Sequence, residues 1–393
     1  MKKKILIVSS SLSTGGLEKT LINLCDNFDY EKYEVDLYLF NDGRDLINKL
    51  NKNANLLQDS PYYSLVYNKP FGFSVKSLIK QKKLGLALYR IKRFIKSRLR
   101  LRRFTISDWR AMKKTMLKIE KHYDVAIGFE EGSSCYYVAD CVSADRKLGW
   151  IHTDISKINP NKKLDKKSFN KLDKVVTVSE NSFNILTNFY PILKEKFTVV
   201  PIGKMLNYQE IDKLVQGKHL MDNSVTKILS VGRLVELTGF HLCVEPLKRL
   251  LDDGYSVKWY VAGDGDYRSI IEQEIEKYGV KDNFILLGNQ SNPYTYIKNA
   301  DICVQPSSYE GMSVCVLEEK HLRKPVVVTN IPSNMEMIEN DVNGKVINRN
   351  SEEIYLAVKD LLDNPDKAKE LGDMPVKGKL TNKEIMKQIE DLF

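Results

Sequence analysis

The sequence predicts an α/β protein built from two domains with parallel sheets, and three observations support this prediction. Short runs of apolar and β-branched residues recur along the chain, as expected for strands buried on both faces of a sheet. Helix-length stretches separate many of these runs. A polar stretch between Pro201 and Ser224 lacks a strand core and interrupts the series. We therefore expect two successive sheets, a boundary near residue 203 and a cleft between the halves.

The expected elements define the domains. The predicted strands of the first sheet are Lys4–Val8, Glu34–Phe40, Asp124–Phe129, Lys147–Ile151, Lys174–Val178 and Phe197–Val200. Those of the second sheet are Lys227–Val231, Ser256–Ala262, Asn283–Leu287, Asp301–Gln305 and Pro325–Thr329. We assign residues 1–203 to a first domain, 204–375 to a second domain and 376–393 to a C-terminal helix, for which a return to the first domain is one expected path. Ligands of such sheets bind beyond the carboxyl ends of the strands, so functional residues are expected in the loops that follow them.

The composition is that of an ordinary globular protein. The chain has 393 residues, of which 42% are apolar and 28% charged, and no apolar run approaches the ~18 residues that a membrane-spanning helix needs. The basic start Lys2–Lys4 is followed by the short apolar run Ile5–Val8, which is too short for a secretory signal. Six cysteines occur without a CxxC pair, which fits neither a disulfide framework nor a zinc site. We expect a reduced, cytoplasmic protein.

Positive charge is concentrated in one segment. The net charge is +10, yet residues 76–121 hold 17 Lys and Arg against only Asp108 and Glu120, so the rest of the chain is net acidic. Within this segment an apolar stripe with helical spacing consists of Leu84, Leu88, Ile91, Phe94, Ile95 and Leu99. The basic residues that border it are Arg90, Lys92, Arg93, Lys96, Arg98, Arg100, Arg102 and Arg103.

This pattern predicts a basic amphipathic helix, and three interpretations are open. The helix can lie on an anionic membrane surface, where each basic residue contributes about 1 kcal/mol, with Arg98, Arg100, Arg102 and Arg103 as contacts. It can instead pack its stripe into the core and leave a solvated basic back, or it can bind nucleic acid. We favour the membrane. Nucleic acid is disfavoured because the rest of the chain is acidic and has no recognisable reader motif.

Two loops have the features of phosphate-binding sites. Gly15 and Gly16 follow the first strand and open a helix, where free amides and the helix dipole favour an anion. This signal is weak, because a glycine pair is more often a tight turn and neither GxGxxG nor GxxxxGKS is present. In the second half, Arg233 and Thr238 follow one strand.

A pair of glutamates follows another strand of the second half. Glu310 is expected at the strand-to-helix turn and Glu318 about two helical turns further on. Gly311, Met312 and Ser313 lie between them, at the start of the helix, where backbone amides have no partner within the helix. Carboxylates near a sugar and a ribose, with amides at the phosphates, are a suitable arrangement for a nucleotide sugar.

Five segments carry a family resemblance. They are GGLEKTLINL (15–24), VGRLVELTGF (231–240), VAGDGDYR (261–268), LGNQSNPYTYIKNADICVQPSSYEGMSVCVLE (287–318) and KPVVVTNIPSNMEMI (324–338). With these residues the chain resembles the group 1 glycosyltransferases, the retaining GT-B enzymes of family 4. The resemblance is close over the C-terminal half and loose over the N-terminal half, and it implies two Rossmann-like domains that face a cleft. The Glu-x7-Glu region is its most specific part.

The resemblance also implies roles for individual residues. It places Arg233 at the donor diphosphate, Glu310 at donor-sugar hydroxyls and Glu318 at the ribose. The amides of Met312, Ser313 and Val314 are expected at phosphate and sugar, Gly16 at the diphosphate, Asn289 near the base and His152 in the active site. Glu130, Glu131 and the Gly15 loop are candidates for acceptor contacts, although a solvated loop and a structural histidine are the plain alternatives.

The chain departs from the family pattern at one position. The family usually has a phosphate-binding Lys where this chain has Thr238, so one charged hydrogen bond worth about 1.5–3 kcal/mol is missing. Weaker donor binding, compensation by Lys204, another donor, or a weakly active protein are all compatible with this change. Asp264-Gly265-Asp266 has the appearance of a metal-binding DxD, but the corresponding loop of the family needs no metal, so we expect neither metal nor cofactor.

Together these observations predict a cytoplasmic, peripheral-membrane transferase. It is expected to move a sugar with retention from a UDP-sugar, less favourably a GDP-sugar, to a lipid-linked glycan in surface polysaccharide assembly. No general base is required if the leaving phosphate accepts the acceptor proton. The alternative from another class is a non-catalytic accessory or chaperone subunit of the same fold that binds a protein partner, and a nucleic-acid-binding protein is a distant third.

Overall fold

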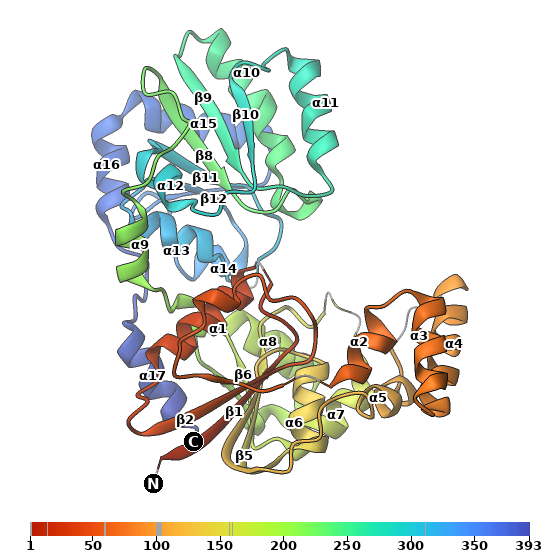
Figure 1. The fold of residues 1–393 in the computed structure, drawn as a ribbon. Coiled ribbons are helices and arrows are strands. Elements are labelled where there is room, and N and C mark those ends of the chain that lie inside the picture. Colours follow the sequence, from red (N-terminus) through yellow and green to blue (C-terminus); the bar gives the residue numbers. More distant parts are fainter. Residues whose placement is uncertain are drawn as a thin grey trace. The chain divides into compact units, whose positions relative to one another are not determined.

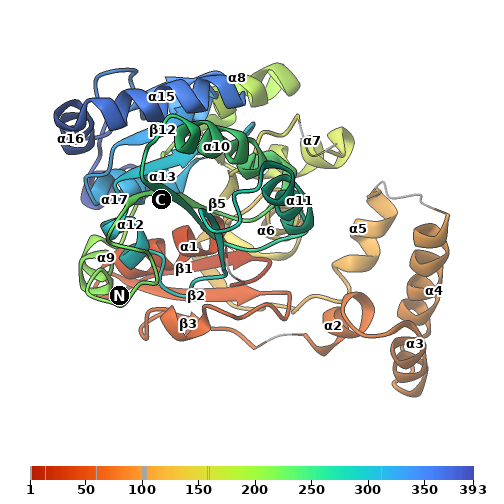
Figure 2. The same cartoon turned by 90° about the horizontal axis from the view of Figure 1, so that it is seen from above.

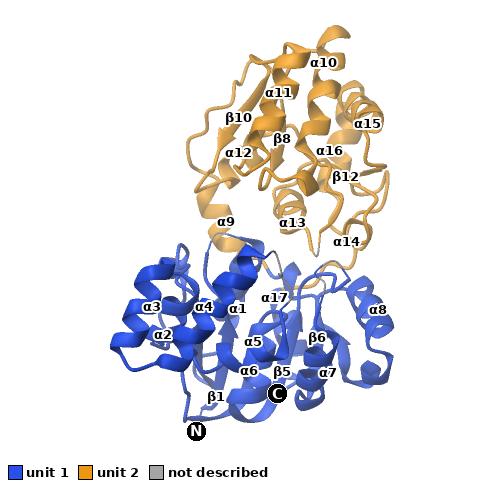
Figure 3. Cartoon of the chain, turned by 90° about the vertical axis from the view of Figure 1, so that its right-hand side faces the viewer, with its two compact units in different colours: residues 1–205, 382–393 blue, residues 206–381 orange. Residues whose placement is uncertain are grey.

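The structure is a computed structural model that describes residues 2–13, 15–58, 60–99, 104–156, 158, 160–310 and 312–393. The chain divides into two compact units (Figure 3). Unit 1 comprises residues 1–205 and 382–393, and unit 2 comprises residues 206–381. Each unit is an α/β domain around one parallel sheet (Figure 1). Gly311, Arg100, Arg102 and Arg103, which the sequence singled out, lie outside the described residues.

Unit 1 contains a seven-stranded sheet in the order β3-β2-β1-β4-β5-β6-β7. All pairings are parallel, and the strands are β1 (Lys3–Ser9), β2 (Tyr33–Leu39), β3 (Asn55–Leu56), β4 (His122–Gly128), β5 (Ser143–Ile151), β6 (Lys174–Thr177) and β7 (Phe197–Val199). Its helices are α1 (Gly16–Asn27), α2 (Pro61–Tyr67), α3 (Phe71–Lys80), α4 (Leu84–Arg98), α5 (Ile106–Met112), α6 (Ser133–Cys141), α7 (Lys162–Lys171), α8 (Glu180–Phe189) and α17 (Asn382–Glu390).

Unit 2 contains a six-stranded parallel sheet in the order β10-β9-β8-β11-β12-β13. The strands are β8 (Thr226–Val231), β9 (Val257–Ala262), β10 (Phe284–Gly288), β11 (Ile302–Gln305), β12 (Val326–Thr329) and β13 (Lys345–Ile347). The helices are α9 (Tyr208–Leu214), α10 (Val244–Asp252), α11 (Arg268–Tyr278), α12 (Tyr294–Asn299), α13 (Val314–His321), α14 (Pro332–Met335), α15 (Ser351–Asp363) and α16 (Pro365–Asp373). Single 3-10 turns occur in both units at Ile47–Lys49, Pro191–Lys196, Ile202–Lys204, Glu236–Thr238 and Phe240–Cys243.

Burial on both faces of each sheet explains why the strands are continuous apolar runs. In β1, the five residues after Lys4 are all buried, and β12 is buried throughout. In unit 2, α10, α11 and α15 pack on one face of the sheet, through residues such as Leu247, while α12 and α13 pack on the other. At the C-terminus, α17 contacts α1, and the ring of Phe393 lies 5.8 Å from that of Tyr33.

The structure differs from the sequence-based expectations in three places. The edge strands β3 and β13, of two and three residues, were not predicted, because such short segments carry no alternating or continuous apolar pattern. The polar stretch 201–224 is not entirely loop, since Asn207 caps α9 through the Glu210 amide at 3.0 Å. Every predicted strand is present, and its ends differ from the predicted ones by at most four residues.

Helices α2–α5 form a helical arm that Figure 2 shows beside the sheet of unit 1. The first helix of the arm, α2, begins at Pro61 and is capped by Ser60. The last helix, α5, has a capping box between Thr105 and Asp108 at its N-terminus. Trp109 anchors α5 to α6 by donating its indole N–H to Asp140 at 2.9 Å. Among the described helices, including those of the arm, none has the length and apolar character of a membrane-spanning segment.

The predicted amphipathic helix is present as α4, but its stripe is not in the core. Leu84, Leu88, Ile95 and Leu99 are 51–68% exposed. Only the inner side of α4 packs, through Ala87 and through Phe94, whose ring stacks on Phe71 at 4.2 Å. The interpretation of a core-facing stripe is therefore wrong for these four residues.

Candidate functional site

The chain order of the strands locates a candidate site in each unit. In unit 2, β8 lies between β9 and β11, so the chain leaves β8 toward one side of the sheet and returns on the other. In unit 1, β1 has the same position between β2 and β4. Such reversal points leave a crevice at the carboxyl ends of the two central strands, where ligands of open α/β sheets bind. The predicted residues Arg233 and Glu310 follow β8 and β11, and Gly16 and Glu130 follow β1 and β4.

In unit 2, hydrogen bonds hold the loops after β8 and β11 together. The Ser308 amide donates to the Leu237 carbonyl at 2.8 Å. Arg349 donates through Nε to Pro306 O at 3.0 Å and through Nη2 to Glu236 O at 2.8 Å. Gly239 permits this close approach, because it has φ 75° and a Cβ there would collide with the Pro306 carbonyl. The two loops therefore form one rigid support for Arg233 and Glu310.

Arg233 and Glu310 interact electrostatically across these loops. Glu310 accepts a hydrogen bond from Ser307 Oγ at 3.0 Å. Burial raises the pKa of Glu310, and the Ser307 hydroxyl and the Arg233 charge oppose that rise. Arg233 itself is exposed and makes no ion pair with the described residues. Its guanidinium is thus available to an anion beside a carboxylate whose position is fixed.

Thr238 does not present its hydroxyl to a ligand. Its Oγ1 lies 2.8 Å from both the Arg233 and the Val235 carbonyl oxygens, so the hydroxyl donates within its own turn. The side chain stabilises the loop that carries Arg233. Thr238, predicted as a donor-binding residue, therefore supports that loop. Lys204, suggested as a substitute for the missing Lys, lies in the 3-10 turn Ile202–Lys204 of unit 1.

The helix after Glu310 presents fewer amides than expected. The Val314 amide donates to Met312 O at 3.1 Å and is therefore engaged within the protein. The amides of Met312 and Ser313 have no partner among the described residues and precede α13 at its positive end. Asn289 is an exposed residue after the edge strand β10, apart from the loops of β8 and β11 in the strand order.

Glu318 and Glu319 are both buried on α13, at 1% and 0% exposure. Glu318 accepts a hydrogen bond from the Tyr294 hydroxyl at 3.0 Å. Glu319 accepts one from Gln305 Nε2 at 2.7 Å, while its Oε2 has no partner in the described part of the chain. Burial, with a smaller contribution from the Glu318 charge, raises the pKa of Glu319 to about 8. Glu319 is therefore a protonated, neutral acid at neutral pH.

Replacing Glu319 by Gln should make stability less dependent on pH. Because the pKa is raised from about 4.5 to about 8 on folding, the folded state holds more protons in this window, and its stabilisation is lost as pH rises. A neutral amide does not titrate. Between pH ~5 and ~8, the free energy of unfolding of the variant should therefore rise relative to that of the wild type by up to about 1.4 kcal/mol per pH unit. Urea unfolding at both pH values measures this, with exposed Glu276→Gln as control. If the free energies of unfolding of the wild type and of Glu319→Gln change equally with pH, the raised pKa of Glu319 is contradicted.

In unit 1, Glu130 mainly organises the loop after β1. Its Oε1 accepts hydrogen bonds from the Ser10 amide and from Ser134 Oγ, the latter at 3.0 Å. Burial raises its pKa, and these donors oppose the rise. This oxygen is thus committed to the loop that leads to Gly15 and Gly16, where α1 begins. Glu130, proposed from the sequence as an acceptor contact, has a structural role at Oε1.

Glu131 holds the loop of His152. Its carboxylate accepts from the His152 amide at 3.0 Å and from Thr153 Oγ1 at 2.7 Å. Burial lowers the pKa of His152 to about 4, against the opposing charge of Glu131, so the imidazole is neutral. His152 Nε2 is buried and makes no hydrogen bond with the described residues. Since β1, β4 and β5 are neighbours, the structure brings Gly16, Glu131 and His152 to one end of this sheet.

Several supporting residues were missed by the sequence analysis. Ser307 stands three positions before Glu310 and Glu319 directly follows Glu318, so both could have been noticed from position alone. Arg349 and Tyr294 had no such signal, because Arg349 lies 43 residues from Pro306 and Tyr294 lies 24 residues from Glu318. Their contacts depend on the tertiary fold.

Comparisons with known proteins find glycosyltransferases. Residues 212–374 match the family model described as glycosyl transferases group 1. An uncharacterized glycosyltransferase of Methanocaldococcus jannaschii, MJ1059, is 28% identical over 40% of this chain and 39% of its own length, so the chain spans less than two thirds of that relative. The amylovoran biosynthesis glycosyltransferase AmsD of Erwinia amylovora is 21% identical over 91% of this chain and 89% of its own.

A solved structure has the same fold over nearly the whole chain. The structure of HepE from Anabaena in complex with UDP-glucose has a TM-score of 0.69 at 16% identity, covering 99% of this chain and all of the other. The predicted GT-B class, with two parallel-sheet α/β domains, is confirmed. The likeness to a sequence family covers residues 212–374, which are similar to the group 1 glycosyl transferases.

Proposed function

We propose that this chain is a retaining glycosyltransferase that moves a sugar from a UDP-sugar to a lipid-linked glycan. The observation that carries the proposal is the electrostatic interaction of the exposed Arg233 with the buried carboxylate of Glu310, on loops that follow the two central strands of the unit 2 sheet. The bond between sugar and diphosphate breaks with positive charge on the anomeric carbon and negative charge on the leaving group. A guanidinium and a carboxylate on the same two loops fit those two charges.

Unit 2 supplies the donor-binding groups in this proposal. Arg233 and the amides of Met312 and Ser313 bind the diphosphate, while Glu310 orients the sugar hydroxyls. Glu318, held by Tyr294, accepts from the ribose hydroxyls. Thr238 stabilises the Arg233 turn and does not replace the missing Lys. The diphosphate is then stabilised by one side-chain charge and by backbone amides, without a metal ion.

Unit 1 supplies the groups at the acceptor and at the donor sugar. His152 is neutral, and its buried Nε2 has no hydrogen-bond partner among the described residues, so a ligand hydroxyl is assigned to it in this proposal. Glu131 fixes the backbone at His152. In the same-face mechanism the leaving phosphate takes the acceptor proton, so none of these residues has to act as a base.

The donor and the biological role are supported by relatives. HepE was solved with UDP-glucose, and AmsD is named for amylovoran biosynthesis. A UDP-sugar donor and surface polysaccharide assembly follow by similarity. The lipid-linked acceptor and a location at the inner face of the cell membrane are motivated by the basic segment 76–121.

A thermal-shift screen of sugar nucleotides tests the donor assignment. A UDP-sugar at 100 times its Kd should stabilise the folded state by about 2.7 kcal/mol, which raises the melting temperature of a domain of this size by roughly 5–10 °C. GDP-sugars should have a smaller effect, and free glucose none. A melting curve that no sugar nucleotide shifts would refute the proposed function.

A further inference from the structure

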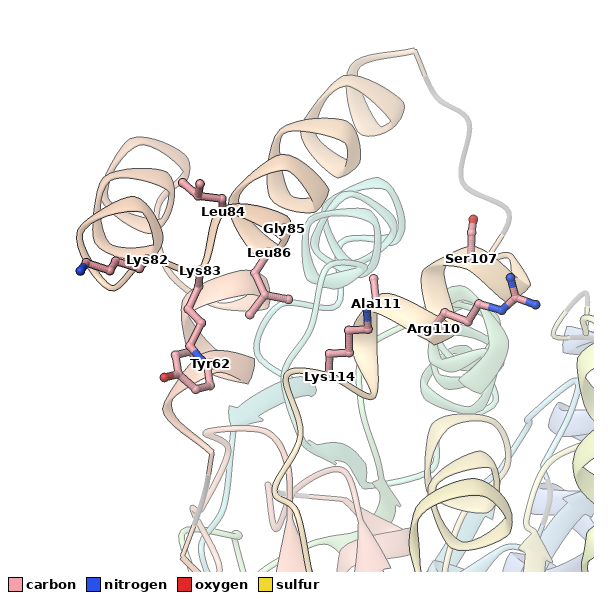
Figure 4. Close-up of a pocket in the computed structure, with 10 residues that line it drawn as sticks. All are labelled: Tyr62, Lys82, Lys83, Leu84, Gly85, Leu86, Ser107, Arg110, Ala111 and Lys114. Atoms are coloured by element: carbon pink, nitrogen blue, oxygen red, sulfur yellow. The ribbon is translucent and has the colours of Figure 1, made fainter.

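The helical arm contains a pocket of about 620 Å³ (Figure 4). The turn between α3 and α4 and the first residues of α4 form one side, where Lys83 and Leu86 lie. The other side comes from α5 and the residues after it, including Ala111 and Lys114. The pocket belongs entirely to unit 1 and includes none of the residues assigned to sugar transfer.

Positive charge dominates the lining of this pocket. Lys82, Lys83, Arg110 and Lys114 line it, and the described lining residues include no carboxylate. None of the four forms an ion pair with a described residue; the Lys83 ammonium lies 4.9 Å from the centre of the Tyr62 ring. A pocket with four cations without counter-ions is suited to an anion with several oxygen atoms.

Other cations close to the pocket are neutralised, which makes the four lining cations distinct. Lys96 pairs with Asp108 at 3.0 Å, and Lys113 pairs with Asp140 at 3.8 Å. The arm therefore has acidic partners for cations that support its own packing. Among its described residues, it provides no acidic partner at the pocket.

The backbone at the pocket is also unusual. Lys82 has φ 57°, in the left-handed region that a glycine normally occupies at the end of a helix. Its amide donates to Ile79 O at 2.9 Å, and the Lys83 amide donates to Leu78 O at 2.8 Å, so the turn is well formed. A lysine thus stands at the position where glycine is least strained, and the turn places Lys82 and Lys83 among the residues that line the pocket.

An exposed apolar stripe borders the pocket. Leu84 lines the pocket and begins the stripe, which continues along one face of α4 with Leu88, Ile95 and Leu99. Lys92 and Arg98 are exposed on the same helix. Phe73 and Ile79 of α3 add further exposed apolar area. A free anion or a nucleic acid would use the cations only, whereas a lipid surface uses both features.

We infer that the helical arm binds an anionic lipid, with the headgroup phosphate in the pocket of Lys83 and Lys114 and the stripe of Leu84 and Leu88 at the acyl-chain boundary. This inference rests on the proposed function, in which the acceptor is lipid-linked. It places the membrane contact on the pocket and the stripe, in addition to Arg98 of the basic segment. Charge complementarity selects anionic lipid over zwitterionic lipid.

Vesicle sedimentation with the full chain tests this inference. The wild type should bind vesicles of phosphatidylcholine and phosphatidylglycerol in equal parts, and bind pure phosphatidylcholine at least tenfold more weakly. Lys83→Glu/Lys114→Glu and Leu84→Ser/Leu88→Ser should each reduce partition into the anionic vesicles at least tenfold. Equal binding to both vesicle types, or undiminished binding of either variant, would overturn the inference.

Matched controls separate the pocket and stripe from general surface effects. Lys166→Glu/Lys167→Glu changes the same charge on the exposed face of α7, and Ile192→Ser removes an apolar side chain that is 87% exposed. Both controls should bind as the wild type does. A fall as large as that of the pocket variant would show that net charge or exposed apolar area alone governs binding, and would overturn the inference. Unchanged melting temperatures show that each variant is folded.

Two further binding experiments identify the ligand. Inorganic phosphate at constant ionic strength should leave vesicle binding intact, because it lacks the apolar contacts; complete displacement would assign the pocket to free phosphate. Binding of an oligonucleotide that is tighter than vesicle binding and is lost in the pocket variant would assign it to nucleic acid. If a UDP-sugar stabilises the protein but the protein does not bind vesicles, only this inference is refuted. If the protein binds anionic vesicles but no sugar nucleotide stabilises it, only the proposed function is refuted.

Discussion

Replacing Glu310 by Gln should slow sugar transfer roughly 10- to 100-fold, which corresponds to the loss of about 1.5–3 kcal/mol from a charged hydrogen bond to the donor sugar. The variant keeps the shape of the side chain and an acceptor oxygen for Ser307, which donates to Glu310 at 3.0 Å. The loop should therefore remain in place while the charge is lost. Release of UDP under saturating donor measures kcat directly.

A matched control makes the Glu310 result specific. Glu276→Gln removes a carboxylate from the exposed face of α11 in the same unit, and its rate should equal that of the wild type. A more disruptive variant, Glu310→Ala, should be at least as slow as Glu310→Gln. Wild-type rates in both Glu310 variants would exclude Glu310 from the donor site.

Replacing Arg233 by Ala should have the largest effect, a loss of roughly 100- to 1000-fold in kcat. Arg233 is the exposed cation that acts on Glu310 electrostatically, and removing a group that stabilises charge in a transition state has a cost of this order. Arg233→Lys keeps the charge but not the two-pronged geometry, so it should recover only part of the activity. Steady-state kcat and KM for UDP release distinguish lost catalysis from weaker donor binding.

Arg249→Ala is the control for the arginine. Arg249 forms an ion pair with Glu352 on the surface of unit 2, where such pairs contribute little to stability. Its removal should leave the rate unchanged. If Arg233→Ala loses no more activity than Arg249→Ala, the diphosphate is not held at this position.

The strands could be predicted from the sequence because a parallel sheet buries both faces. Val326–Thr329 is apolar or β-branched throughout and fully buried, so its sequence alone indicates a strand. The edge strands β3 and β13 could not be recognised, because two or three residues at an edge need no apolar pattern. The spacing of Leu84 and Leu88 predicted a helix, but nothing in the sequence decided whether their side chains faced the core or solvent.

The candidate site could be predicted as far as its motifs extend. The positions of Arg233 and Glu310 after strands were sufficient to expect them at one edge of the sheet. The groups that fix them, such as Arg349, come from distant segments and required the structure. The hydrogen bonds of Thr238 within its own turn and of Glu130 to the Ser10 amide also required the structure.

The structure of this chain with a bound UDP-sugar tests the central claim most directly. The account predicts that the diphosphate lies within hydrogen-bonding distance of the Arg233 guanidinium and of the Met312 and Ser313 amides. The ribose should lie at Glu318 and the sugar at Glu310. A sugar nucleotide bound elsewhere, with the loops after β8 and β11 making no contact to it, would contradict the account.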